Sequence, residues 1–302
     1  MPKTPTLAVH AMVAVASGSF PGAAVTLAVP TLVRHSTDLA VLTYNVKALP
    51  FLAGGWNKDE RLRAIRARID RYDIALFHEA FTSVPNLLAG FVARGAMSSE
   101  RFGIAMRSVR LTGSTGLAAA IFRPVLTVGS AEIGHYSVCS GTFGRANDCL
   151  ASKGFAMQRV RLAGVEIDVY DTHLDADLRD APTRAVQRNE LAAAMQRFRA
   201  ARAVILGGDF NIERGDTTEF AALTRFSSGA SLTDAGITSS TAWPEHLDYV
   251  LFRGSAEADI TLRAAGEDPS FRMQETAVSD HPAMYAILRV TPRRRTDGDN
   301  AH

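Results

Sequence analysis

The residues that could do chemistry lie at the ends of apolar segments. The apolar run 203–206 leads through Gly207 and Gly208 to Asp209 and Asn211. Side chains of a strand alternate with a period of two, so Asp209 and Asn211 share one face if the extended geometry continues past the glycines. A carboxylate and an amide directed at one point suit a metal-bound water or a phosphate oxygen. The competing interpretation is a strand end followed by an Asx turn.

Polar side chains of the same kinds follow or interrupt other apolar segments. They are Asn45, the pair His78–Glu79, Asp171, His173, Asp175, Asp248 and the run Ser279–Asp280–His281. An unpaired charge beside an apolar strand is costly. Several such groups in one chain therefore indicate a shared pocket rather than separate polar groups within the core.

The side-chain types indicate the chemistry of this pocket. Asn45, Glu79 and Asp280 offer hard oxygen ligands, which suit Mg²⁺ or Ca²⁺ more than zinc. His173 and His281 can donate to phosphate oxygens or move protons near neutral pH. We find no serine or cysteine in a nucleophile motif, so water is the expected nucleophile. A hard cation, carboxylates and histidines around a water describe phosphoester hydrolysis.

Alternating apolar runs and helical stretches must position these groups from residue 39 onward. Strands are expected at 39–46, 73–81, 116–123, 155–162, 165–174, 203–210, 246–253 and 283–290. Helices are expected at 58–72, with its arginines outside, and at 181–202. Because strands outnumber helices, the pattern favours two sheets packed face to face with helices outside over a doubly wound parallel sheet.

The composition sets limits on the class of protein. The 302 residues are 47% hydrophobic and 21% charged, which fits one large globular domain. The formal net charge of +2 gives no strong global field for nucleic acid.

Residues 1–38 are rich in small apolar side chains and resemble a secretory leader, or else form a disordered extension. Residues 293–302 form a charged tail. A leader implies a secreted or periplasmic protein, and its absence a cytoplasmic one.

Whether the two cysteines, Cys139 and Cys149, form a disulfide depends on that compartment. In an exported protein we expect them to form a disulfide. Closing so short a loop would stabilise the fold by about 2–3 kcal/mol. In a cytosol they would be two small apolar residues.

Six motifs, TYNV, FHEAF, DTHLDA, GGDFNIE, LDYVLF and SDHPAM, occur in this order. Together they resemble the endonuclease/exonuclease/phosphatase superfamily over residues 39–292. The resemblance implies a four-layered α/β sandwich of the deoxyribonuclease I type, with two packed, mainly antiparallel sheets flanked by helices. It also implies a Mg²⁺ cofactor, for which Mn²⁺, Co²⁺ or Ca²⁺ could substitute.

The resemblance also implies a role for each matching residue. Glu79 would be the main metal ligand with Asn45 beside it, and Asp280 would be a ligand or support one. His281 would be the general base or a transition-state donor, oriented by Asp248.

Two further matches concern the water and the phosphate. Asp209 would position or activate the attacking water, and its division of labour with His281 stays open. Asn211 and His173 would hold phosphate oxygens.

The substrate is indicated by the segment 147–160, in which Asp148 and Lys153 precede a strand. A Lys-Gly pair before an apolar strand resembles the neutral and bacterial sphingomyelinases, whose lysine lies near the active site. Here it would bind a phosphodiester oxygen as a point charge. The competing interpretation is a surface turn. Segment 47–60 adds Phe51 and Trp56, which fit a membrane interface if they are exposed.

The expected function is that of a phospholipase C-type sphingomyelinase, which acts on sphingomyelin at a membrane surface and releases phosphocholine and ceramide. Segment 225–246 has no long aromatic-tipped hairpin, which argues against deep membrane insertion. The first alternative is a secreted nuclease of the deoxyribonuclease I type with nucleic acid as substrate, although the low net charge argues against a basic groove. The second is a catalytically inactive binding module. No obligate protein partner is evident.

Overall fold

The computed structural model describes residues 35–49, 55–88, 115–122, 125–141, 148–197, 202–225, 232–236 and 247–293. The expected leader and the charged tail therefore lie outside the described residues, except for the leader's last four positions and Arg293. In the part of the chain that is described, we find no helix long and apolar enough to cross a membrane.

Within these ranges the first large sheet has the strand order β10-β13-β1-β2-β3. Its members are β1 (Thr37–Asn45), β2 (Ile74–His78), β3 (Ala118–Ile121), β10 (Ala258–Glu267) and β13 (Met284–Pro292). Neighbouring strands are antiparallel except β1 and β2, which run parallel. That parallel pair brings two polar strand ends to the same edge of the sheet.

The second large sheet, again within the described residues, has the order β4-β5-β6-β7-β9-β8. Its members are β4 (Leu126–His135), β5 (Gly154–Leu162), β6 (Val165–His173), β7 (Ala203–Asp209), β8 (Thr233–Asp234) and β9 (Asp248–Arg253). Only β6 and β7 run parallel. A short hairpin of β11 (Arg272–Met273) and β12 (Thr276–Ala277) stands apart from both sheets.

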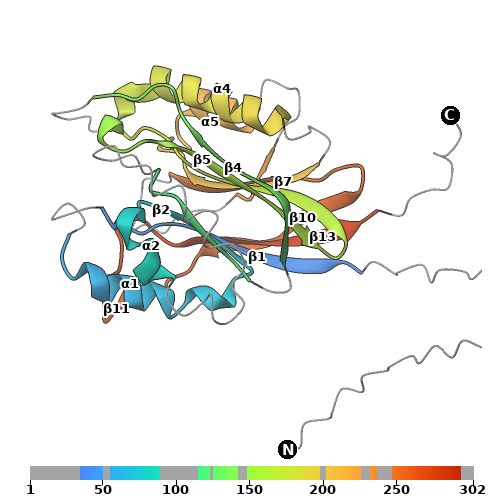
Figure 1. Ribbon diagram of the computed structural model, residues 1–302, viewed down its shortest axis with the longest axis horizontal. Coiled ribbons are helices and arrows are strands. Elements are labelled where there is room, and N and C mark those ends of the chain that lie inside the picture. Colours follow the sequence, from blue (N-terminus) through green and yellow to red (C-terminus); the bar gives the residue numbers. More distant parts are fainter. Residues whose placement is uncertain are drawn as a thin grey trace, which may run out of the picture. The chain divides into compact units, whose positions relative to one another are not determined.

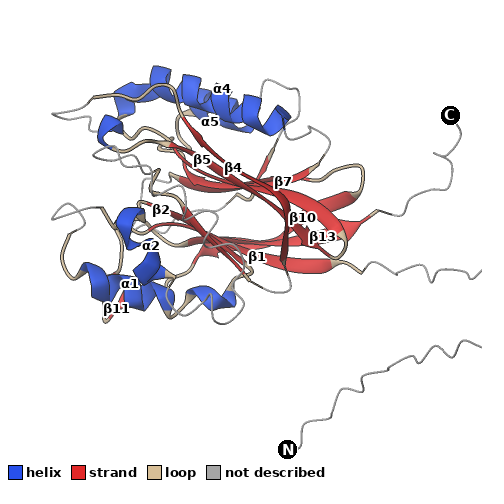
Figure 2. Cartoon of the chain, viewed as in Figure 1, coloured by secondary structure: helices blue, strands red, loops and turns tan. Residues whose placement is uncertain are grey.

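The two sheets pack face to face, and helices cover their outer sides (Figure 1). Helices α1 (Lys58–Arg66) and α2 (Val84–Leu87) lie on the outer side of the five-stranded sheet. Helices α4 (Ala181–Arg197) and α5 (Thr217–Thr224) lie on the outer side of the six-stranded sheet. Figure 2 shows the resulting order of helix, sheet, sheet and helix. The expected four-layered, mainly antiparallel sandwich is confirmed.

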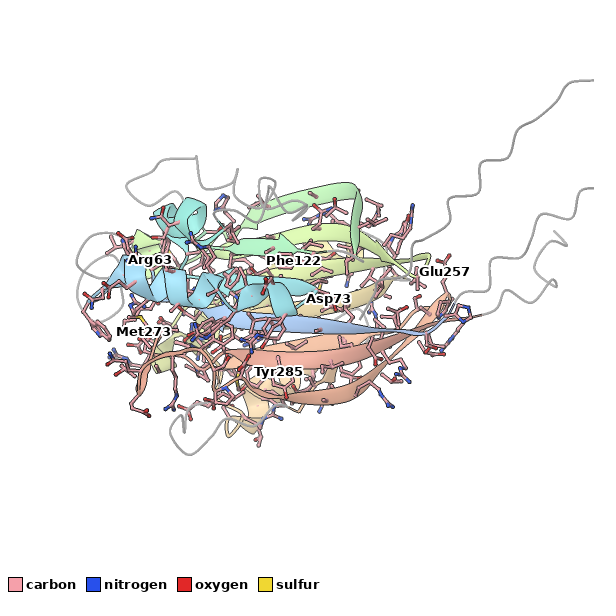
Figure 3. The ribbon with its side chains drawn as sticks, turned by 90° about the horizontal axis from the view of Figure 1, so that it is seen from below. Arg63, Asp73, Phe122, Glu257, Met273 and Tyr285 are labelled. Carbon is pink, nitrogen blue, oxygen red and sulfur yellow. A yellow bond between two sulfur atoms is a disulfide. The ribbon has the colours of Figure 1, made fainter. Side chains whose placement is uncertain are left out.

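Three apolar clusters hold these layers together. Side chains alternate along each strand, so Val41 of β1 faces the cluster between the sheets while Leu42 faces the cluster under α1. The central cluster is mostly aliphatic and takes residues from both sheets, such as Leu76 and Ile205. On the outer side near α1, the partly exposed Tyr285 packs on the second cluster (Figure 3).

The expected strands are all present, but two expected elements end early. The helix expected at 58–72 stops at Arg66 and is followed by a 3-10 turn at Ile69–Arg71, because Arg68 leaves helical geometry. The strand expected at 73–81 stops at His78, because Glu79 and Phe81 have positive φ angles of 55° and 34°.

Strands β4 and β10 and helix α5 were not expected. Most side chains of β4 and β10 are exposed or only half-buried, so these strands lack the apolar run that indicates a core strand. The arginines of α1 were expected outside, and this is wrong for Arg61, which is buried. Its guanidinium donates to the carbonyls of Val46, Lys47 and Val278, and these contacts offset the cost of burying it.

The close pairing of β4 and β5 requires glycine at 154. A Cβ atom there would lie 2.1 Å from the carbonyl oxygen of Gly134, which is backbone and cannot move aside cheaply. We therefore predict that Gly154→Ala lowers the free energy of unfolding by about 2 kcal/mol or more. Urea denaturation measures this loss. Gly215→Ala is the matched control, since no heavy atom lies within 4 Å of its Cβ position. Equal stability of the two variants would contradict the prediction.

Candidate active site

Strand ends from both sheets meet at one edge of the sandwich. In the first sheet Asn45 is the register partner of His78. In the second sheet His173, Asp209 and Asp248 lie side by side in register. The amide Nδ2 of Asn45 donates to Asp209 Oδ2 over 2.9 Å, which joins the two sheets at this edge. The sequence expectation of one shared pocket thus corresponds to one cluster of side chains.

Glu79 presents its carboxylate from a turn that only a positive φ angle allows. Its φ is 55°, a left-handed conformation that ends the extended strand directly after β2. Within the described residues we find no donor that hydrogen-bonds the carboxylate. Burial raises the pKa of Glu79; the Lys153 ammonium opposes this rise and the Asp209 carboxylate adds to it. A half-buried carboxylate without a donor among the described residues, close to other acids, fits a site for a hard divalent cation.

The two other residues expected to bind metal differ in their surroundings. Asn45 is buried, and its Oδ1 accepts from the backbone N–H of Lys47 over 3.0 Å. Asp280 is exposed, and its carboxylate forms a salt bridge with Lys47. The hydroxyl of Ser279 donates to the carbonyl of Asn45 over 2.6 Å and so ties the Asp280 segment to the end of β1.

His281 is held by a carboxylate, as the resemblance implied. Its Nδ1 lies 2.7 Å from Asp248 Oδ2 and 3.7 Å from Asp209 Oδ2. Burial of the ring lowers the pKa of His281, but the carboxylates of Asp248 and Asp209 more than offset this and raise it to about 10. In this arrangement His281 carries a proton at neutral pH.

The common face expected for Asp209 and Asn211 is a wrong prediction. Strand β7 ends at Asp209, and Asn211 has a φ of 51° instead of an extended backbone. The backbone N–H of Asn211 donates to Asp209 Oδ1 over 3.2 Å, which is an Asx turn. The Asn211 amide donates to the carbonyl of Leu174. The glycines before Asp209 do permit close approach, since a Cβ at Gly208 would meet Thr172 at 2.8 Å.

Lys153 and His173 form the wall of the site on the second sheet. Lys153 is buried, and its Nζ lies 2.6 Å from His173 Nε2, 3.0 Å from the carbonyl oxygen of Leu174 and 3.2 Å from Asp148 Oδ1. Burial and the Lys153 ammonium both lower the pKa of His173 well below its usual range. The surface turn considered for Lys153 is thereby wrong.

A disulfide closes the loop that carries Asp148. Cys139 and Cys149 are bonded, with their Cα atoms 5.2 Å apart. Asp148 Oδ2 accepts from the backbone of Ala176, and Asp175 accepts from the backbone of Ser140. The loop is thus fastened to the chain that follows β6.

Four residues near the site were not singled out from the sequence for a role. Lys47 pairs with Asp280, Arg61 fastens the chain around Lys47, and His78 and Asp171 pair with each other over 2.8 Å. A signal existed for Lys47, because it is one of four lysines and directly follows a motif. Arg61 had no such signal, since its helix carries several arginines.

Buried carboxylates and two histidines at the edge of a two-sheet sandwich define a phosphoesterase-type site. The chain belongs to the Endonuclease/Exonuclease/phosphatase family, which matches residues 42–281. This is a family of metal-dependent phosphoesterases. A sphingomyelinase of Mycobacterium tuberculosis is 36% identical over 162 residues, which cover 47% of this chain. The match spans only 32% of that relative's length.

Solved structures share the fold at low sequence identity. Sphingomyelinase C from Streptomyces griseocarneus has a TM-score of 0.58 and 21% identity, covering 83% of this chain and 99% of that one. A humanized D. rerio TDP2 also has a TM-score of 0.58, at 15% identity, covering 83% and 98%. Beta toxin from Staphylococcus aureus, with bound magnesium ions, has a TM-score of 0.55 and 17% identity, covering 85% and 100%.

The Glu79 carboxylate gives a prediction that does not depend on activity. We predict that Mg²⁺ raises the melting temperature of the wild type, with about 2.7 kcal/mol of stabilisation at 100 times Kd. Glu79→Gln should show no such rise. Without metal it should be at least as stable as the wild type, because an acid whose pKa is raised by folding costs stability once it is ionised. Thermal denaturation with EDTA or Mg²⁺ measures both effects.

The exposed Glu257 offers a matched control for this experiment. Glu257→Gln should keep the full Mg²⁺ response. Equal responses in Glu79→Gln and the wild type would rule out Glu79 as a ligand.

The raised pKa of His281 predicts a pH-dependent stability. The folded state binds the His281 proton more tightly than the unfolded state does. The resulting stabilisation of the fold is complete below pH 6.5 and is lost as the pH rises through about 10. In EDTA, the wild type should exceed His281→Gln in stability by an amount that shrinks from pH 6.5 to 10. Urea denaturation across this range measures the difference. A constant difference would show that the carboxylates do not hold the proton on His281.

Proposed function

We propose that this protein is a Mg²⁺-dependent sphingomyelinase that hydrolyses sphingomyelin to phosphocholine and ceramide. The observation that carries the proposal is the position of Lys153. Its ammonium lies 2.6 Å from His173 Nε2, within the cluster that contains Asp209. The Lys-Gly segment that resembles sphingomyelinases is therefore part of the site wall and not a distant surface turn.

The local similarity to curated proteins supports the same substrate class. The 36% identity to the Mycobacterium tuberculosis sphingomyelinase is well above the identity to the solved structures that share the fold. A fold by itself does not choose a substrate. The proposal therefore depends on the sequence match and on Lys153 rather than on the sandwich.

In the proposed site, Glu79 would hold the cation, with Asn45 beside it and Asp280 in support. A bound Mg²⁺ supplies positive charge to the phosphoryl oxygens. Asn211 and His173 would face the remaining phosphoryl oxygens. Hydrogen bonds fix all of these groups except Glu79, so the chain arranges its polar groups before substrate arrives.

Asp209 and His281 would each serve one proton transfer: Asp209 on the side of the attacking water and His281 on the side of the leaving oxygen. Burial raises the pKa of Asp209, but His281, His173 and His78 together with the Asn45 amide lower it to a net value well below the usual range. Asp209 therefore stays ionised and can accept a hydrogen bond from the attacking water. His281 is protonated and can donate. The water oxygen bonds to phosphorus, the bond from phosphorus to the ceramide oxygen breaks, and that oxygen takes the His281 proton. The water proton passes by Asp209 to solvent.

Two features fit a lipid substrate met outside the cytosol. Trp56 is 55% exposed, and its backbone carbonyl accepts from Arg61, which also holds the chain at Lys47 beside the site. An exposed tryptophan suits the boundary between membrane and water. The Cys139–Cys149 disulfide suits an oxidising compartment, and we accordingly propose export.

The substrate test compares two substrates for one preparation. With Mg²⁺, the wild type should cleave sphingomyelin in liposomes and leave plasmid DNA intact. Lys153→Met should lower kcat/KM for sphingomyelin by about 10- to 1,000-fold, because it removes a charge from the site at similar volume. Lys58→Met is the matched control, since among the described residues the Lys58 ammonium hydrogen-bonds only to the carbonyl of Leu49. Phosphocholine release and gel electrophoresis report the two activities.

Two outcomes would overturn the proposal. Cleavage of DNA without cleavage of sphingomyelin would establish the nuclease alternative in its place. No cleavage of either substrate by a folded, Mg²⁺-binding protein would favour an inactive binding module.

A further inference from the structure

His78 is a buried histidine whose only part in the proposed hydrolysis so far is to help lower the pKa of Asp209. It ends β2 directly before Glu79, and its side chain is completely buried. Its ring lies between two carboxylates of the opposite sheet, with Nε2 2.8 Å from Asp171 Oδ1 and Nδ1 3.8 Å from Asp248 Oδ1. Asp171 belongs to β6 and Asp248 begins β9. One ring therefore spans the gap between the sheets at the level of the site.

The contact with Asp171 is a defined hydrogen bond. An ionised carboxylate only accepts, so Nε2 carries the hydrogen and donates. Asp171 is completely buried, and among the described residues we find no hydrogen-bond partner for its other oxygen. Removing the donor would leave a buried carboxylate with neither oxygen paired by a side chain, and this lowers the stability of the folded state. This bond fixes the rotation of the His78 ring.

The second carboxylate leads from His78 to the reacting groups. Asp248 Oδ2 contacts His281 Nδ1 at 2.7 Å. Asp248 Oδ1 is buried and faces His78 Nδ1, and no described residue donates a hydrogen bond to it. The distance of 3.8 Å is too long for a hydrogen bond, but it allows an electrostatic contact between two buried groups. Asp248 thus lies between two histidines, of which only His281 reaches the solvent side of the site.

We propose that His78 is a positioning residue for phosphoester hydrolysis at this site. Anchored by Asp171, its ring holds the Asp248 carboxylate in one orientation, and Asp248 in turn holds His281 toward the substrate. His78 does not touch the substrate, because its side chain has no exposed surface. The inference rests on the proposed hydrolytic function of the same site, but it does not depend on whether the substrate is a lipid.

A purely structural role for His78 makes a different prediction. In that case its loss would weaken the packing of the two sheets, and activity would follow the fraction of folded protein. Leu76 is the matched control, because it is buried in the same strand and packs between the same sheets. Leu76→Ala should lower stability while leaving kcat of the folded protein near that of the wild type.

The experiment uses the full chain, Mg²⁺ and the soluble phosphodiester 4-nitrophenyl phosphorylcholine. His78→Leu should lower kcat by about 10- to 100-fold, with KM changed little, as expected when a group that orients a reacting residue is lost. His78→Asn, whose amide replaces Nδ1 toward Asp248, and His78→Gln, whose amide replaces Nε2 toward Asp171, should each recover part of kcat. These polar variants also decide the question if His78→Leu does not fold.

Two further measurements test the route through Asp248. The double variant His78→Leu/Asp248→Asn should be no slower than Asp248→Asn alone, because both changes act on His281. The NMR signal of the His281 Nδ1 proton should broaden or shift in His78→Leu and stay unchanged in Leu76→Ala.

The outcomes separate this inference from the proposed function. Additive losses in the double variant, or kcat in the His78 variants that matches Leu76→Ala, would overturn the positioning role. A folded wild type that hydrolyses neither this phosphodiester nor sphingomyelin would instead overturn the proposed function.

Discussion

The hydrogen bond from Asn45 to Asp209 is the contact on which the site depends. It joins the end of β1 to the end of β7, and these strands belong to different sheets. Apolar packing alone would hold the sheets together but would leave their separation at this edge loosely defined. The bond fixes that separation where Glu79 and His281 must face one substrate. The parallel pairs β1–β2 and β6–β7 then supply polar strand ends on both sides of it.

The charges around this bond differ from those in the rest of the protein. Arginine is far more common than lysine here, since only four of the 33 basic residues are lysines. Two of those four, Lys47 and Lys153, nevertheless lie at the site. Elsewhere arginine makes the forked pairs that hold helices and strands, as between Arg184 and Glu219. A lysine is a compact point charge that does not fix the plane of its partner. At the site, lysine therefore supplies positive charge without fixing the orientation of a carboxylate, whereas the planar, two-pronged contact of an arginine would immobilise it.

The sequence predicts the parts of the site that local patterns determine. Apolar runs that end in polar residues place Asn45, Glu79 and Asp209 at one edge, because strand ends meet wherever such strands pack as sheets. The Asx turn between Asp209 and Asn211 is also local, and it was one of the two interpretations that the sequence allowed. The bond from the Asn211 amide to Leu174 and the burial of Arg61 depend instead on partners far along the chain, so neither could be predicted. Strand β10 was not predicted because most of its side chains are exposed or only half-buried, so it lacks an apolar run.

The disulfide between Cys139 and Cys149 links the shape of the site wall to the conditions under which the protein is made. It closes the loop that carries Asp148, and Asp148 faces Lys153. When the chain is synthesised in a reducing cytoplasm, that loop loses its covalent link and depends on non-covalent contacts such as those of Asp148 and Asp175. Preparations from oxidising and reducing hosts are then different materials with the same mass to within two hydrogens. Thiol titration of each batch is needed before specific activities from different hosts are compared.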